Sequence, residues 1–146
     1  MCKQFLIGLA VAAIAAYSFT NDFGVAKIIA VSNAAELGYA PQISIERGVK
    51  VTVVLQNIPS EAQSWDFRVN LETHTQDMSD DMVKSSVLIA SGKKYMSLGW
   101  EGSPPGGHHR MGLLRFKAID PKPESVDLQI RLVGDPSPRN FKWKLK

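Results

Sequence analysis

A two-residue alternation of apolar and polar side chains constrains the fold of this chain more than any other feature. It is clearest in residues 65–71, 126–132 and 141–145. Successive side chains on a β-strand point to opposite faces of the sheet, so each run predicts a strand with one buried and one solvated face. A helix would instead need an apolar period of about 3.6 residues.

Weaker alternation predicts further strands between these runs. The weaker candidates are residues 42–46, 50–56, 85–90, 94–98 and 111–118. Turn-forming pairs such as Arg47-Gly48 and Ser91-Gly92 separate them. About seven or eight short strands with such turns favour an all-β fold, an immunoglobulin-like antiparallel β-sandwich over residues 35–146. A small closed barrel is the alternative fold.

The first residues have the layout of an export segment. Lys3 precedes the uncharged residues 5–19, and Asn21 and Asp22 end the apolar run. A basic start and a short apolar core are typical of a signal peptide, whereas a membrane span needs about 20 apolar residues. Residues 1–34 are therefore predicted to be a signal peptide, or an uncleaved membrane anchor with a linker. A buried helix is the third interpretation. An export segment would make the domain extracytoplasmic: periplasmic, secreted or membrane-anchored.

Charge and cysteine content narrow the classes of partner. The net charge is +3 at pH 7, and basic residues are mixed with acidic ones except in the tail of alternating lysines. Nucleic-acid binders concentrate their basic residues, so we expect no nucleic-acid partner, and membrane contact only through the N-terminal segment. The only cysteine is Cys2, so the predicted domain has no disulfide framework.

An unusual stretch at residues 100–112 breaks the strand pattern. It reads Trp-Glu-Gly-Ser-Pro-Pro-Gly-Gly-His-His-Arg-Met-Gly. Glycine permits backbone angles closed to other residues and proline fixes them, so this composition predicts a defined loop. We expect a wide hairpin connection between residues 94–98 and 111–118. Its residues Trp100, Glu101 and Arg110 are candidates for binding a partner.

The three histidines suggest a metal site. His108 and His109 are adjacent in this loop, and His74 follows the strongest predicted strand on its polar side. Neutral imidazole suits copper and zinc, so convergence of these histidines with Asp77 or Glu101 would form a transition-metal site. Methionine also occurs in exported copper carriers, and four methionines are near in sequence: Met78, Met82, Met96 and Met111. In the competing interpretation a histidine only hydrogen-bonds and shapes the loop, because adjacent strand residues point to opposite faces.

Two stretches resemble motifs of a known family. Thr73-His74-Thr75-Gln76-Asp77-Met78 matches Thr-His-(Ser/Thr)-x-Asp-(Leu/Met). The stretch from Trp100 to Phe116 matches Trp-(Glu/Asp)-Gly-x-x-x-Gly-Gly-His-His-x-x-Gly-x-Leu-x-Phe. Both are similar to motifs of small exported β-domains of uncharacterised role in bacteria and archaea. The resemblance covers roughly residues 42–145 and implies a shared fold, but it brings no activity with it.

No sequence pattern predicts catalysis. Gly102-Ser103-Pro104 lacks the second glycine of a nucleophile elbow, and the aspartates at 77, 80 and 81 are too sparse for a calcium loop. The leading hypothesis is an extracytoplasmic, non-enzymatic binding or interaction domain, with copper or zinc as the candidate ligand. The alternative is a structural or adaptor domain without a ligand. It would contact another envelope or extracellular protein through a sheet edge or the residue 100–110 loop.

Overall fold

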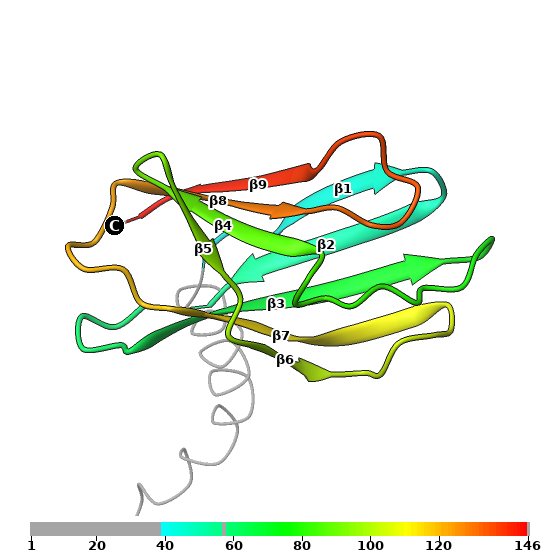
Figure 1. The fold of residues 1–146 in the computed structure, drawn as a ribbon, viewed down its shortest axis with the longest axis horizontal. Coiled ribbons are helices and arrows are strands. Elements are labelled where there is room, and N and C mark those ends of the chain that lie inside the picture. The colour runs from blue at the N-terminus through cyan, green and yellow to red at the C-terminus, as the bar shows by residue number, and fades with distance from the viewer. Residues whose placement is uncertain (1–38, 57, 146) are drawn as a thin grey trace, which may run out of the picture. The chain divides into compact units, whose positions relative to one another are not determined.

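The alternating runs become strands, and these strands assemble into two antiparallel sheets (Figure 1). The computed structural model describes residues 39–56 and 58–145, so the predictions for residues 1–34 fall outside the described residues. The strands are β1 (Gln42–Glu46), β2 (Val49–Leu55), β3 (Ser64–Thr73), β4 (Ser86–Ala90), β5 (Lys93–Met96), β6 (Gly99–Gly102), β7 (His109–Lys117), β8 (Ser125–Ile130) and β9 (Arg139–Lys144). The first sheet has the order β1-β2-β3-β7-β6 and the second β5-β4-β8-β9.

The predicted alternation decides which side chains form the core. Trp65, Phe67, Val69 and Leu71 of β3 are all buried, and the apolar residues of β8 and β9 are buried as well. The two sheets share this core, since the rings of Phe67 and Trp143 have centres 5.6 Å apart. The all-β prediction is confirmed, with two sheets in place of the alternative closed barrel.

Side-chain bonds join β1 at the edge of the first sheet to β9 at the edge of the second. The Gln42 side chain accepts a hydrogen bond from the Lys142 N–H (2.9 Å) and donates one to the Lys142 carbonyl. The Trp143 Nε1–H donates to the Ala40 carbonyl (3.0 Å). These hydrogen bonds hold the two edge strands together. They also occupy the backbone N–H and carbonyl of Lys142, which a free sheet edge would leave unpaired.

The predicted hairpin between residues 94–98 and 111–118 is wrong. β5 pairs with β4 in the second sheet, and the chain then crosses at Ser97 and Leu98 to the first sheet. There β6 pairs with β7, so the loop predicted over residues 100–110 shrinks to residues 103–108. The described residues thus contain nine strands, one more than the longest prediction.

β6 packs closely on β7 because two glycines face each other. Gly102 and Gly112 are register partners in the ladder. A Cβ on Gly112 would lie 2.6 Å from the Trp100 ring and 2.7 Å from the Glu101 carbonyl oxygen. Only a residue without a side chain lets Trp100 lie across β7 in this way.

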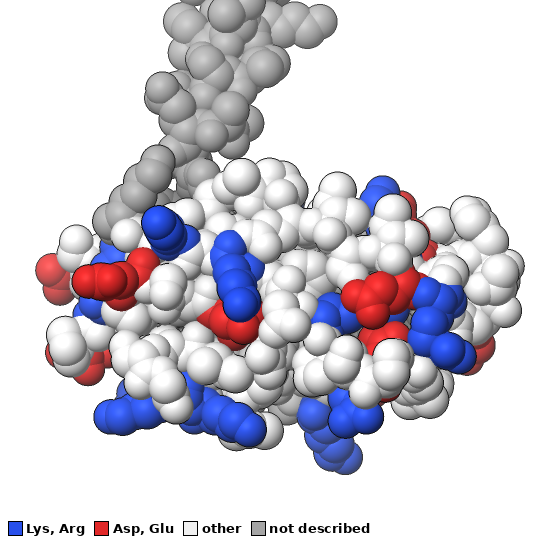
Figure 2. All heavy atoms as spheres, turned by 90° about the horizontal axis from the view of Figure 1, so that it is seen from above, with Lys and Arg blue, Asp and Glu red and all other residues white. Residues whose placement is uncertain are grey.

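Charged side chains of both signs lie on the outward faces of the strands. Figure 2 shows basic side chains interrupted by acidic and uncharged ones over the face it presents. On the first sheet, Lys50 pairs with Glu72 (3.0 Å) and Arg115 with Asp66 (2.8 Å).

In the part of the chain that the structure describes, there is no helix long and apolar enough to cross a membrane.

Candidate functional site

The two motif stretches lie side by side at one end of the first sheet. The Thr73 N–H, at the end of β3, donates to the His108 carbonyl (2.9 Å). Met78 exchanges two backbone hydrogen bonds with the loop before β7: its N–H donates to Gly107 (3.1 Å), and its carbonyl accepts from Gly106 (2.7 Å). The strand end that carries His74 therefore lies beside the histidine loop, as a shared metal site would require.

His74 and His109 are in contact on the outward side of this end. The β3–β7 register pairs Glu72 with His109, which places the His109 side chain on the solvated face. The imidazole centres of His74 and His109 are 6.1 Å apart, and their planes are inclined by 78°. Both side chains are exposed, so an ion from solvent has access to the pair.

The other two predicted ligands have different surroundings. Asp77 accepts a hydrogen bond from the Gly107 N–H through its carboxylate, which holds the loop against the end of β3. His108 is exposed, and its carbonyl bonds Thr73. Among residues 39–56 and 58–145, no group of three or more His, Cys, Asp or Glu side chains is placed to hold a metal ion. The contact that the structure makes is the pair His74–His109.

The carboxylate of Glu72 lies beside this pair, opposite His109 in the register of β3 and β7. The Lys50 ammonium bonds Glu72 at 3.0 Å. That hydrogen bond and the Lys50 charge, with a smaller contribution from His109, lower the pKa of Glu72. Glu72 is therefore an ion-paired carboxylate, and the Lys50 charge offsets the negative charge that it places next to His109.

One methionine shares the face of the histidine pair. Met111 follows His109 by two residues on β7, so its side chain points the same way, and it is 57% exposed. Met78 and Met82 are buried in the core, and Met96 lies on the second sheet. Of the four methionines near in sequence, Met111 is the one that shares the outward face of β7 with His109, and the register places it on the side of His109 away from His74.

Comparisons with protein-family models, with curated proteins and with solved structures find no match for this chain. The resemblance based on the two motifs stays an expectation. The function must therefore be argued from the geometry of the site.

The three predicted partner-binding residues have unequal access to solvent. The Trp100 ring is half-buried, and its Nε1–H donates to the Ser103 carbonyl (2.9 Å). Glu101 is exposed, with its nearest basic group 3.8 Å away on Arg115. Arg110 is buried, with 1% of its surface exposed. A partner at this surface would meet Glu101 and the exposed part of Trp100.

Arg110 fixes the segment that connects the two sheets. Its guanidinium donates to the carbonyls of Met78 (3.1 Å) and Asp80 (2.8 Å), and it lies 5.8 Å from the centre of the Trp100 ring. Its Nε has no hydrogen-bond partner within the described residues. Burial lowers the pKa of Arg110, although the charges of Asp80 and Asp77 oppose this effect. The group remains a buried cation that clamps the backbone after β3.

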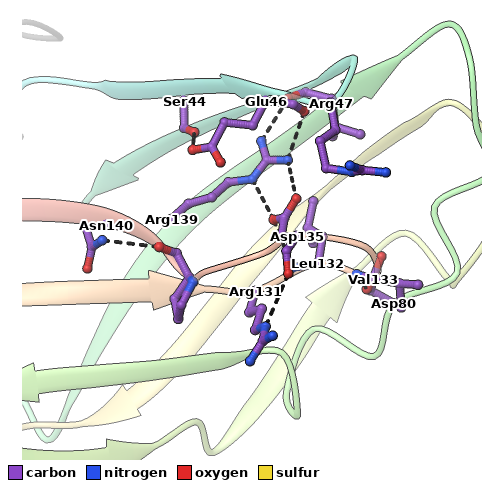
Figure 3. Close-up of polar contacts among 12 residues, drawn as sticks. Ser44, Glu46, Arg47, Asp80, Arg131, Leu132, Val133, Asp135, Arg139 and Asn140 are labelled. Carbon is purple, nitrogen blue, oxygen red and sulfur yellow. Dashed lines mark hydrogen bonds and ion pairs between the residues drawn. The ribbon is translucent and has the colours of Figure 1, made fainter.

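A second buried charge network has no counterpart in the sequence analysis (Figure 3). Arg139 and Asp135 form an ion pair at 2.8 Å, with side chains 0% and 2% exposed. Arg139 also donates to the carbonyls of Val49 (2.8 Å) and Glu46 (3.1 Å), so it joins β9 to the first sheet. Burial alone would raise the pKa of Asp135. The hydrogen bonds from Arg139 and from the Leu132 N–H outweigh burial and lower this pKa.

Proposed function

We propose that the chain is an extracytoplasmic, non-enzymatic binding domain that holds a transition-metal ion, copper or zinc, at His74 and His109. The observation that carries the proposal is the contact of two exposed imidazoles with centres 6.1 Å apart. With nitrogen–metal distances of about 2.0–2.1 Å, two rings on one ion have centres roughly 5–6.4 Å apart. The spacing of the two ring centres falls within this range, which supports a shared ion.

The backbone that carries both rings is held in place before any ion arrives. His109 belongs to the β3–β7 ladder, and Thr73, next to His74, bonds the His108 carbonyl. The Thr73 hydroxyl also donates to the Gly48 carbonyl (2.9 Å). Ligands on rigid elements lose little conformational freedom on binding, which supports a site on this end of the sheet.

The open position of the pair favours binding over catalysis. Catalytic sites usually lie in concave pockets that exclude water from the reacting groups. His74 and His109 stand exposed on an outward sheet face. An ion held there remains accessible to another ligand or to a receiving protein, as carriage or transfer of a metal requires.

Isothermal titration calorimetry of the full chain with Cu(II) and with Zn(II) tests this proposal. We expect His74→Ala and His109→Ala each to weaken binding by at least about tenfold, since even indirect partners of a metal contribute 10–100-fold. His108→Ala is the matched control, an exposed neighbour outside the pair, and should bind like the wild type. The proposal fails if the wild type binds neither metal at micromolar concentration, or if His108→Ala weakens binding as much.

The finer description of the fold and location belongs to the same proposal. Two antiparallel sheets around one core, with the chain crossing between them after β3, β5 and β7, support an immunoglobulin-like sandwich. Residues 1–34 act as a signal peptide or membrane anchor. Cell fractionation should recover the protein outside the cytoplasm, and its intact mass distinguishes cleavage from a retained anchor. Full-length chain found solely in the cytosol contradicts export.

The edge strand β6 favours a second function, that of an adaptor without a metal. The Ser103 N–H donates to the Met111 carbonyl on β7 (3.0 Å). Because the backbone groups of successive residues on a strand point alternately to either side, those of Gly102 and Trp100 face away from β7. Proteins guard such edges with lysine or proline, and Lys93 and Lys94 do so on β5. β6 reads Gly-Trp-Glu-Gly, without either residue. It therefore suits an added strand from another envelope or extracellular protein.

Photo-crosslinking in the native envelope separates this adaptor function from metal binding. A probe at exposed Leu98, beside β6, should give one discrete adduct, and a probe at Lys94 on the lysine-guarded β5 edge should give none. Absence of an adduct from Leu98 in a protein that binds copper or zinc would contradict the adaptor function.

A further inference from the structure

We infer that the edge of β6 accepts an antiparallel strand that places a lysine or arginine opposite Glu101 and an apolar residue two positions further on. This inference rests on the adaptor function and deepens it, because it names the chemistry of the partner segment. Three features carry it: the unpaired side of the β6 backbone, the exposed carboxylate of Glu101, and an apolar groove beside the edge.

The backbone of β6 offers hydrogen-bonding groups at two residues on the open side of the first sheet (Figure 1). Trp100 and Gly102 direct their N–H and carbonyl groups away from β7. Neither residue is a proline, so an added strand can bond both N–H groups and both carbonyls. The neighbouring pair β6–β7 is antiparallel, and antiparallel pairing is slightly more stable than parallel pairing.

A second copy of β6 is a poor occupant of this edge. Two antiparallel copies satisfy all these groups in one register, which pairs Trp100 of each copy with Gly102 of the other. The same register sets the two copies of Glu101 directly opposite each other, in the type of pair where facing side chains lie closest. Like charges in that position are destabilising. The edge therefore selects a strand of another sequence.

The charge of Glu101 is available to a partner. Its side chain is 79% exposed, and its carboxylate lies 3.8 Å from Arg115. The Arg115 guanidinium makes two shorter hydrogen bonds, of 2.8 and 3.1 Å, to the carboxylate of Asp66. A lysine or arginine opposite Glu101 therefore gains a cross-strand ion pair, whereas an acidic residue there meets repulsion.

An apolar groove lies next to Glu101 on the outward face. Its volume is about 370 Å³, and its lining includes Leu98, Gly99 and Leu113. In an antiparallel pair, the partner residue two positions after the basic one lies opposite Gly99 and on the same face as the basic one. Because Gly99 has no side chain, an apolar group fits there and covers Leu98, which is 63% exposed. Backbone bonds and a side-chain pocket together are typical of recognition by strand addition.

NMR titration of the full chain with synthetic peptides tests the inference. The probe is acetyl-Ser-Thr-Lys-Val-Leu-Thr-Ser-amide, and a second peptide carries glutamate in place of the lysine. We expect the lysine peptide to bind about 3–30-fold more tightly, since the exchange turns an attractive cross-strand pair into a repulsive one. Hydrogen exchange of the Trp100 and Gly102 amides should slow in the complex, while that of the Lys94 amide on β5 should not change. Equal affinity for the two peptides would overturn the inference.

A charge reversal in the protein gives the matched experiment. Glu101→Lys should reverse the preference and bind the glutamate peptide more tightly than the lysine peptide. Because the side chain is exposed, this variant should unfold at the same temperature as the wild type. Glu61→Lys is the control, an exposed glutamate outside β6, and should keep the preference of the wild type. An unchanged preference in Glu101→Lys would refute the role of this carboxylate.

A change in the peptide backbone tests the strand pairing itself. The peptide valine faces Trp100 in the expected register, and its N–H donates to the β6 edge. N-methylation of this valine should abolish binding to the wild type and to Glu101→Lys alike. Retained binding would show that the peptide does not add to the sheet, and it would overturn the inference.

The outcomes distinguish this inference from the adaptor function. If the probe at Leu98 gives its adduct in the envelope but the peptides show no charge preference, the partner chemistry is refuted and the adaptor function stands. If neither an adduct nor peptide binding is found, both fail. Slow exchange of the Trp100 and Gly102 amides without peptide, in a chain that sediments as a dimer, would assign the edge to a second copy and overturn the inference.

Discussion

At the scale of single residues, two charged side chains that lie inside the protein contribute strongly to its stability. Arg139 and Asp135 are almost completely buried, and their ion pair joins the two sheets through further bonds to backbone carbonyls. A buried pair of this kind gains little over apolar residues of the same shape, but removal of one partner leaves the other charge stranded. Such residues are therefore far more sensitive to substitution than the charges on the surface.

Arg139→Met should destabilise the protein by about 3–5 kcal/mol, because the carboxylate of Asp135 would lose its partner in a buried position. Urea denaturation measures the change in the free energy of unfolding. Lys84→Ala is the control: it removes an exposed pair with Asp81 (3.4 Å) and should leave the midpoint unchanged. A midpoint for Arg139→Met equal to that of the control would contradict this role.

The same pair predicts a dependence on pH. The pKa of Asp135 is lower in the folded protein than in the unfolded chain, so its ionised form stabilises the fold fully above the ordinary value of about 3.9. This contribution is lost as the pH falls below about 4 and through the lowered pKa. Asp135→Asn should be less stable than the wild type at pH 7 and lose less stability between pH 5 and pH 2. Equal losses in the two proteins would assign acid sensitivity to other groups.

At the scale of elements, the alternation predicts strands well where apolar residues repeat. Residues 42–46 are predicted and found as β1 with the same bounds, and β3, β8 and β9 bury the expected faces. β6 escapes prediction because Gly-Trp-Glu-Gly carries no two-residue rhythm. The crossing at Ser97 and Leu98 escapes it too, because an alternation indicates which face is buried but not which sheet a strand joins.

The candidate site is predictable in composition but not in geometry. The sequence identifies all three histidines and places His74 on the polar side of its strand. The contact of His74 with His109 depends on the register between β3 and β7, which pairs residues far apart in the chain. The burial of Arg110 had no signal, because it lies in a stretch that looks like a polar loop.

The facing glycines of β6 and β7 give a prediction at this scale. Gly112→Ala should destabilise the protein by about 1–3 kcal/mol, because the new methyl group would displace Trp100 or the backbone of β6. Tryptophan fluorescence should report the displaced ring, and thermal unfolding the loss of stability. Gly99→Ala is the control, since a Cβ there meets nothing within 4 Å, and it should leave both measurements unchanged.

At the scale of the whole molecule, one core holds both sheets together. Phe67 packs edge-on against Phe116 of the same sheet and at a tilt of 53° against Trp143 of the other, with ring centres 5.6 Å apart in each case. Neither sheet buries its inner face without the other. The described strands should therefore unfold in one cooperative transition.

Phe67→Ala should cost about 3–5 kcal/mol, since it leaves a cavity at the point where the two sheets meet. Calorimetry should show a single transition at a lower temperature. Ile45→Ala, at a position 71% exposed on β1, should change stability by less than about 0.5 kcal/mol. Two separate transitions in either protein would show that the sheets are independent.

The hydrogen bonds by which Gln42 joins β1 to β9 also limit how copies of this chain can assemble. Growth of a fibre by strand addition needs two open margins on every unit, one to receive a neighbour and one to offer to the next. The Gln42 side chain occupies the backbone N–H and carbonyl of Lys142, so the middle of the β9 edge is closed to such pairing. Association of two copies through β6 alone uses one edge on each copy, so it ends at a pair and does not propagate.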